Sequence, residues 1–128
     1  MRLLLDTCTF LWLALNPENV STKVRDVFEN RTNTLFFSAA SAWEITIKHQ
    51  LGRMGLPDPP NIYIPARAVI YDLEMIDIRM PHALLAGSLP LHHKDPFDRM
   101  LIAQAKIEEL IVMTPDIAFA PYGVPLLW

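Results

Sequence analysis

A chain of 128 residues has the usual length of a single domain, and its 52% hydrophobic and 20% charged residues indicate a globular rather than a disordered protein. The single cysteine, Cys8, excludes an intramolecular disulfide and any zinc site built from several cysteines. A net charge of −3 argues against a protein that coats nucleic acid non-specifically, but it is compatible with an enzyme whose acidic pocket is neutralised by bound cations. We therefore expect one domain over residues 1–128.

The apolar N-terminus does not have the pattern of a secretion signal. Asp6 interrupts the run that begins at Leu3, and no pair of small residues marks a cleavage site. No other stretch approaches the roughly 20 apolar residues that span a membrane. Cys8 lies in an apolar segment typical of a buried thiol, which suits a reducing compartment. The sequence predicts a cytoplasmic protein that does not interact with membranes.

Apolar runs alternate with helical patterns in the first half of the chain. Ser21 and Ser38 stand where helix caps are favoured, and Asn16-Pro17 is typical of a helix end. In the helix after Ser38, apolar spacing predicts a buried stripe of Ala40, Trp43, Ile47 and Leu51. The expected elements are a strand over 2–5, a helix over 7–15 capped by Thr7, a helix opened by Ser21, a strand over 34–37, and a helix from Ser38 to Gly52.

The second half continues this alternation. Asp95-Pro96 is the clearest helix start, with aspartate as the cap and proline at the first helical position. The expected elements are a helix over 62–73, a strand over 75–78, a short helix from Pro81, a loop over 88–94, a helix from Asp95 to Glu109, a strand over 111–113, and a possible fifth strand over 124–127. This pattern predicts an α/β fold with a mostly parallel central sheet of four or five strands and helices on both faces.

Carboxylates stand where such a sheet binds its ligands, beyond the carboxyl ends of the strands. Asp6 follows the first strand and Asp116 the fourth, although an aspartate there also serves simply to cap the next helix. Glu44 borders the expected buried stripe, where an unpaired carboxylate is costly, so it either ligates a metal or pairs with Lys48. Asp98 lies in the first turn of its helix, where it either faces a ligand or stabilises the helix start.

Several carboxylates in one pocket repel one another unless protons or cations intervene. Oxygen donors without a set of thiolates or histidines select hard cations, which indicates Mg²⁺ or Mn²⁺. One or two such ions activate a water and stabilise the leaving oxygen of a phosphodiester. The residues therefore predict a metal-dependent phosphoesterase site formed by Asp6, Glu44, Asp98 and Asp116.

Four segments match a known pattern, in order, over essentially the whole chain. They are Leu3–Thr7, Ser38–Ile45, the very specific His92–Ala105, and Thr114–Asp116 followed by Phe119 and Tyr122–Pro125. Together they resemble PIN-domain ribonucleases, and in particular the VapC toxins of VapBC toxin–antitoxin pairs.

This resemblance implies a single PIN-like domain, endonucleolytic cleavage of RNA with Mg²⁺ or Mn²⁺, homodimers, and inhibition by a cognate antitoxin protein. It also implies a catalytic and metal-binding cluster at Asp6, Glu44, Asp98 and Asp116. Thr114 is implied as a polar helper. Pro115 departs from the basic or polar residue expected there and removes one backbone donor, which leaves the role of the Thr114 hydroxyl open.

Substrate contact is one interpretation for five further residues, Thr7, His92, Lys94, Arg99 and Thr114. The pair His92-His93 ligates a metal, contacts phosphate or docks its loop; adjacent residues rarely point at one metal, and no further ligand pair accompanies them. Lys94 and Arg99 flank the acidic site and either hold RNA phosphates or remain solvated. Trp12 and Trp43 suit a core or an interface better than a base-stacking platform.

Two other phosphotransfer folds place an aspartate at the end of a strand. A haloacid-dehalogenase-like phosphatase needs Asp-x-Asp, whereas Asp6 is followed by Thr7 and Cys8, and a receiver domain needs paired acids and a late lysine that are not visible. The alternative outside enzymology is a binding module whose acidic pocket captures a basic protein segment. Mg²⁺-dependent RNA cleavage that Asp6→Asn abolishes would separate a nuclease from such a module.

Overall fold

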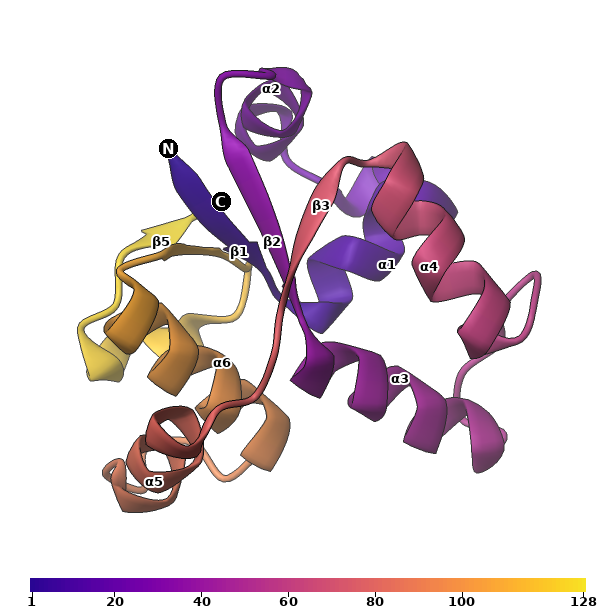
Figure 1. Ribbon diagram of the computed structural model, residues 1–128. Coiled ribbons are helices and arrows are strands. Elements are labelled where there is room, and N and C mark those ends of the chain that lie inside the picture. Colours follow the sequence, from indigo (N-terminus) through magenta and orange to yellow (C-terminus); the bar gives the residue numbers. More distant parts are fainter.

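The computed structural model describes residues 1–128 and contains one five-stranded sheet with the strand order β3-β2-β1-β4-β5 (Figure 1). The strands are β1 (Arg2–Leu5), β2 (Thr34–Ser38), β3 (Leu73–Ile76), β4 (Ile111–Met113) and β5 (Leu126–Leu127). Every neighbouring pair runs parallel. The predicted α/β class and parallel sheet are confirmed, and the segment at the C-terminus does form a fifth strand.

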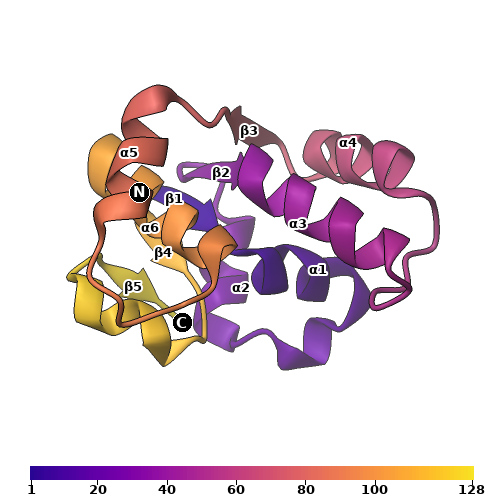
Figure 2. The ribbon, with the colours of Figure 1, turned by 90° about the horizontal axis from the view of Figure 1, so that it is seen from below.

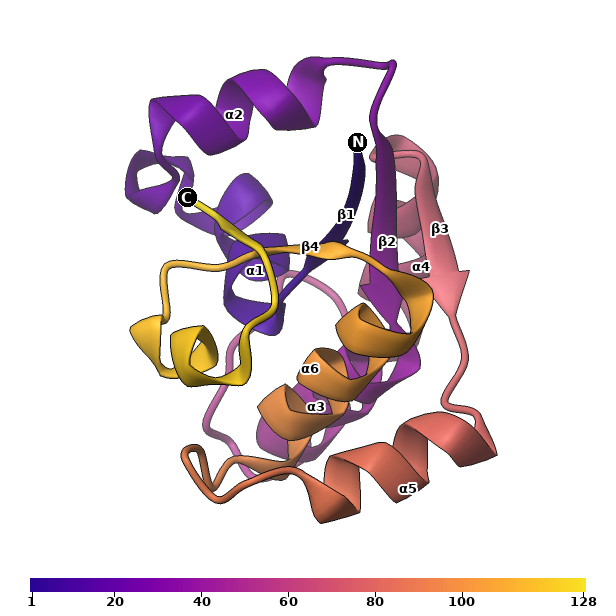
Figure 3. The ribbon, with the colours of Figure 1, turned by 90° about the vertical axis from the view of Figure 1, so that its left-hand side faces the viewer.

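Helices lie on both sides of this sheet (Figures 1 and 3). They are α1 (Thr7–Leu15), α2 (Thr22–Glu29), α3 (Ala39–Gln50), α4 (Pro60–Ile70), α5 (Met80–Ser88) and α6 (Pro96–Glu108), with the 3₁₀ segments η1 (Pro17–Asn19) and η2 (Ile117–Tyr122). One face packs against α1, α2 and α4, and the other against α6 and η2, with α5 on the outer side of α6. None of these helices combines the length and the apolarity of a transmembrane segment.

The central strand β1 is buried from both sides. Leu3 and Leu5 pack with the core formed by α1, α2 and α4, whereas Leu4 packs with the core under α6. All three leucines have no exposed surface. Each fully buried leucine contributes roughly 1.5–3 kcal/mol relative to an exposed one, which explains why this strand is a continuous apolar run without a polar face.

The chain order of the sheet reverses at β1, because β2 lies on one side of it and β4 on the other. In parallel sheets, such a switch point opens a crevice beyond the carboxyl ends of the two strands. Four helical segments begin at this end of the molecule, which Figure 2 shows from below. Their N-terminal caps are Asp6 for α1, Ser38 for α3, Asp95 for α6 and Asp116 for η2.

Three element boundaries differ from the prediction. The carboxylate of Asp6, not the hydroxyl of Thr7, caps α1, because Asp6 Oδ1 accepts the N–H of Thr9 at 2.8 Å. Helix α4 begins at Pro60, whose fixed φ suits a first helical turn, and ends at Ile70. Strand β3 accordingly begins at Leu73, after a turn in which Asp72 adopts a φ of 53°.

The buried face of α3 is also not the predicted stripe. Trp43 is 59% exposed and Leu51 60% exposed, whereas the buried residues of this helix are Ala40, Ser41, Glu44 and Ile45. Helix α3 packs against α1, α4 and α6 at the end of the sheet, so its inner side includes Glu44. Periodicity located the helix correctly, but it did not show which side the neighbouring helices would cover.

We predict that Asp95→Ala lowers the free energy of unfolding by about 0.5–2 kcal/mol, the usual cost of losing an N-cap. Asp95 Oδ1 accepts the N–H groups of Phe97 at 2.8 Å and Asp98 at 3.1 Å, and alanine leaves both donors without this partner. Urea denaturation of the two proteins measures the difference. Asp98→Asn is the matched control, because its carboxylate accepts no N–H of the helix; an equal loss in that variant would argue against the cap.

Candidate functional site

Asp6 is fixed at the carboxyl end of β1 by two hydrogen bonds. It is only 4% exposed; Oδ1 caps α1 as described, and Oδ2 accepts a hydrogen bond from the Thr114 hydroxyl at 2.6 Å. Burial raises the pKa of Asp6, and the hydrogen bonds from Thr114 and Thr9 partly oppose this change. The carboxylate is therefore held in one orientation in a place where its charge is costly.

Thr114 connects the ends of the two central strands. While its hydroxyl donates to Asp6, it accepts the backbone N–H of Asp116 at 3.0 Å. Asp116 in turn caps η2 by accepting the N–H of Ala118 at 2.9 Å. Because Pro115 has no N–H, the first donor after Thr114 is that of Asp116, and the unexpected proline is compatible with this arrangement. The Thr114 hydroxyl thus links the carboxylate of Asp6 to the backbone of Asp116.

Glu44 of α3 lies beside the same strand end and is only 5% exposed. Its Oε1 accepts a hydrogen bond from the Thr7 hydroxyl at 2.6 Å, and its Oε2 pairs with Lys48 one turn further along the helix. The salt bridge to Lys48, which the sequence analysis gave as the alternative to metal binding, is therefore present, and Glu44 is nevertheless buried. Thr7 is buried, and its hydroxyl donates to Glu44. It therefore orients this carboxylate, which replaces the expected role of Thr7 in substrate contact.

Asp98 faces His93, whereas the predicted substrate contact of this pair of histidines was His92. His93 Nε2 lies 2.8 Å from Asp98 Oδ2 and 3.8 Å from Asp116 Oδ2. These three side chains place ligand atoms within 4.8 Å of one another, in an arrangement suited to a metal ion. His92, named instead as a substrate contact, is exposed and packs its ring 5.3 Å from that of Tyr122. In the sequence, the motif His92–Asp98 places two adjacent histidines near Asp98, but it does not indicate which of them contacts this acid.

Arg99 does not face the site, and the prediction that it holds RNA phosphate is wrong. Its guanidinium is buried and donates to four backbone carbonyl groups, those of Ala86, Leu89, Pro90 and His93. Tyr122 completes the contacts, because its hydroxyl accepts the N–H of His93 at 2.8 Å and donates to Pro90 O at 2.6 Å. Arg99 thus fixes the loop that carries His93.

Negative charge around Asp98 exceeds the positive charge available to balance it. Burial, followed by the charges of Asp95 and Glu44, raises the pKa of Asp98 to about 7, and the hydrogen bond from His93 only partly opposes this rise. A carboxyl group with this pKa is substantially protonated near neutral pH. Burial and the neighbouring acids thus make the charged form of the Asp98 carboxyl costly.

The charges of all four predicted acids affect the pKa of the Cys8 thiol. Burial and then the charges of Asp6, Asp98, Asp116 and Glu44 raise the pKa of its thiol to about 12, although the residue is half-buried rather than fully buried. All four acids thus lie near enough to Cys8 to affect its thiol, but only Asp98 and Asp116, together with His93, place ligand atoms within 4.8 Å of one another. A crowded set of oxygen donors with excess negative charge fits a divalent cation.

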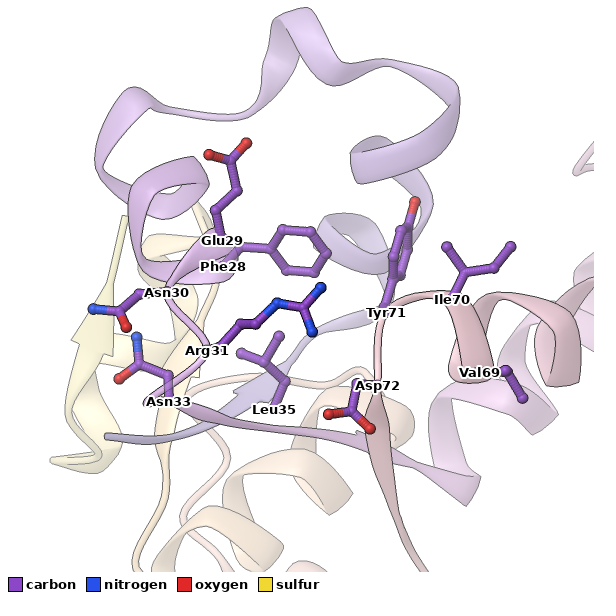
Figure 4. Close-up of a pocket in the computed structure, with 10 residues that line it drawn as sticks. All are labelled: Phe28, Glu29, Asn30, Arg31, Asn33, Leu35, Val69, Ile70, Tyr71 and Asp72. Atoms are coloured by element: carbon purple, nitrogen blue, oxygen red, sulfur yellow. The ribbon is translucent and has the colours of Figure 1, made fainter.

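A cavity that contains none of these acids lies elsewhere on the molecule. Its volume is about 750 Å³, and Figure 4 shows it between the ends of α2 and α4, with Leu35 near the start of β2 on its floor. The lining residues belong to the segments 28–35 and 69–72, and none of them is a predicted site residue. The carboxylates are therefore arranged at the edge of the sheet and not inside this cavity.

The raised pKa of Asp98 predicts how the stability of the metal-free protein depends on pH. Because the folded protein binds this proton more tightly than the unfolded chain, the contribution of Asp98 to stability is fully present below about pH 4 and is lost as pH rises through about 7. The side chain of Asp98→Asn does not titrate in this range. The free energy of unfolding of the variant, relative to that of the unchanged protein, should therefore increase as pH rises from 4 to 8. Urea titrations in chelator measure this difference, and a constant difference would contradict the shift.

Comparison with known proteins identifies the family of this fold. The family model described as PIN domain matches residues 3–124. A 45-residue segment covering 35% of the chain is 40% identical to Ribonuclease VapC16 from Mycobacterium tuberculosis, and it spans 32% of that relative's length.

Solved structures share the fold over nearly the full length. The chain aligns with VapBC2 from Rickettsia felis bound to a DNA fragment from their promoter (TM-score 0.72, 18% identity, 100% of this chain and 99% of the other). It also aligns with DNA-bound VapBC from Salmonella typhimurium (TM-score 0.70, 18% identity, 99% and 97%) and with FitAcB from Neisseria gonorrhoeae (0.66, 17%, 98% and 96%). Because the PIN domain model matches nearly the whole chain, and the sheet order and the acids at the strand ends agree with it, this chain belongs to the PIN domain family.

Proposed function

We propose that this protein is a Mg²⁺- or Mn²⁺-dependent endoribonuclease that acts in the cytoplasm as the toxin of a toxin–antitoxin pair. The observation that carries the proposal is the cluster of under-neutralised carboxylates at the switch point of a PIN sheet. The similarity to a relative named as a ribonuclease supports the choice of RNA as the substrate. The fold shared with chains of VapBC complexes supports the antitoxin partner.

In this proposal, Asp6, Glu44, Asp98 and Asp116 hold the metal. When bound, the ion lowers the pKa of water and neutralises charge on the phosphate. The chain's own contribution is to fix the donors before substrate arrives. Thr114 holds the carboxylate of Asp6 and the backbone of Asp116, while Thr7 and Lys48 hold Glu44. Such preorganisation avoids the cost of collecting like charges during the reaction.

The substrate's own charge requires a basic group at the rim of the site. Lys94 follows His93 directly, is exposed, and has no hydrogen-bond or ion-pair partner. It is thus free to contact an RNA phosphate, which positions the backbone without reading the sequence. We assign it this role in place of Arg99, which is internal.

For the partner, the exposed apolar residues near the carboxylates offer a docking surface. Trp43 precedes Glu44 and packs edge-on against Phe97, which precedes Asp98, with ring centroids 5.4 Å apart. An antitoxin tail that lays apolar side chains here would bring a basic residue to the neighbouring carboxylates. The proposal also includes a homodimer, which would form through other exposed apolar residues.

Asp6→Asn should abolish metal-dependent RNA cleavage and leave the fold intact. The Oδ1 of asparagine still accepts the N–H of Thr9, but an amide nitrogen replaces the oxygen that accepts from Thr114. Removing one charge from the cluster offsets the loss of that hydrogen bond, so the stability of the metal-free protein should hold or rise. Cleavage of total RNA with added Mg²⁺ or Mn²⁺, together with thermal melting, tests both points. Asp95→Ala is the control, since it loses a cap but should retain most activity below its melting range.

Two results of that experiment would overturn the catalytic role. An Asp6→Asn protein that lost activity only because it unfolded would remove the evidence for catalysis. Metal-independent capture of a basic peptide by a folded chain that never cleaves RNA would favour the binding module instead.

Expression of this chain alone should arrest growth of its host, and co-expression of the neighbouring open reading frame should relieve the arrest. The physical reason is that a basic residue placed beside the carboxylates occupies the position of the cation. Growth curves with and without the second frame measure the effect, and the Asp6→Asn variant controls for toxicity unrelated to cleavage. A chain that is folded, expressed and harmless by itself would contradict the toxin assignment.

A further inference from the structure

His93 stands out because it is the only imidazole among the carboxylate oxygens of the site. We propose that His93 Nε2 is itself a metal ligand together with Asp98 and Asp116, and that this nitrogen makes the site prefer Mn²⁺ to Mg²⁺. The inference rests on the proposed function, since it names the ion and one ligand of the same site. It differs from the oxygen-only donor set that the sequence analysis predicted.

The distances suit ligands on adjacent corners of one ion. With metal–ligand bonds of about 2.1 Å, neighbouring ligands of an octahedral ion lie about 3 Å apart. His93 Nε2 is 2.8 Å from one oxygen of Asp98 and 3.8 Å from one oxygen of Asp116. Small side-chain adjustments therefore bring the three atoms into one coordination shell.

The loop around His93 holds the ring in this position. Its backbone N–H is bound by the Tyr122 hydroxyl, and its carbonyl accepts from the buried Arg99 guanidinium. The ring packs edge-on near Phe119, at 6.1 Å between centroids, and the side chain is 18% exposed. His92, the next residue along the chain, is exposed instead. Fixed backbone and ring contacts are those expected of a preorganised ligand.

The nature of the donor decides which ion is favoured. Carboxylate oxygens serve Mg²⁺ and Mn²⁺ alike, whereas imidazole binds transition ions and is a poor ligand for Mg²⁺. The competing interpretation is that Nε2–H of His93 only donates a hydrogen bond to Asp98 and orients it. The two roles differ in an observable way, because only a ligand places nitrogen in direct contact with the ion.

The test uses the full chain, stripped of metal, and titrates it with Mn²⁺ alone or Mg²⁺ alone in a calorimeter. We expect tighter binding of Mn²⁺, and a loss of at least about tenfold in Mn²⁺ affinity in both His93→Ala and His93→Gln, with a smaller change for Mg²⁺. Glutamine retains a hydrogen-bond donor for Asp98 but not the imidazole nitrogen. His92→Ala is the matched control and should bind Mn²⁺ as the unchanged protein does. Circular dichroism confirms that each variant is folded.

Pulsed electron paramagnetic resonance of bound Mn²⁺ provides a second measurement. A nitrogen coupling should be present in the unchanged protein and in His92→Ala, and absent from both His93 variants. Full Mn²⁺ affinity in His93→Gln, or no nitrogen coupling in the unchanged protein, would overturn this inference and leave the nuclease proposal standing. A chain that binds neither ion would overturn both.

Discussion

The bridge made by the Thr114 hydroxyl is the interaction on which the candidate site depends. It joins Asp6 at the end of β1 to the backbone of Asp116 after β4, residues that are 110 positions apart in the chain. The two strands are neighbours only because the sheet order reverses at β1. One hydroxyl therefore fixes the carboxylate of Asp6 and the backbone of Asp116 at the switch point of a parallel sheet, and the N–H of Ala118 holds the carboxylate of Asp116.

The remaining contacts hold acidic groups together without neutralising them. Asp6 and Asp116 use their oxygens as helix caps, where the positive end of a helix favours a carboxylate. Glu44 has one cationic partner, Lys48, and Asp98 has His93. Helix caps and hydroxyl groups supply orientation but no full charge, so electrostatic repulsion persists in the folded protein. Burial first, and then the charges of Asp95 and Glu44, raise the pKa of Asp98, and a divalent cation would offset the excess of negative charge.

The loop before α6 shows how a charged residue serves the site from inside the protein. Arg99 is buried, and its charge is met by backbone carbonyl groups rather than by a carboxylate. It follows Asp98 directly, so the helix that presents the acid also anchors the loop that returns His93 to it. Loss of this anchor would release the histidine without removing any site residue, which makes the geometry of the site depend on buried packing.

The sequence by itself determined the parallel sheet, because strands alternate with helices along the chain, and it located Asp6 and Asp116 after strand ends. Asp95-Pro96 also specified its helix start through local capping chemistry alone. Only the tertiary structure decided which side of α3 is buried, that Thr7 meets Glu44, that Arg99 is internal, and which histidine reaches Asp98. Each of these depends on contacts between elements far apart in the sequence or on the path of a loop, and periodicity carries no information about such contacts.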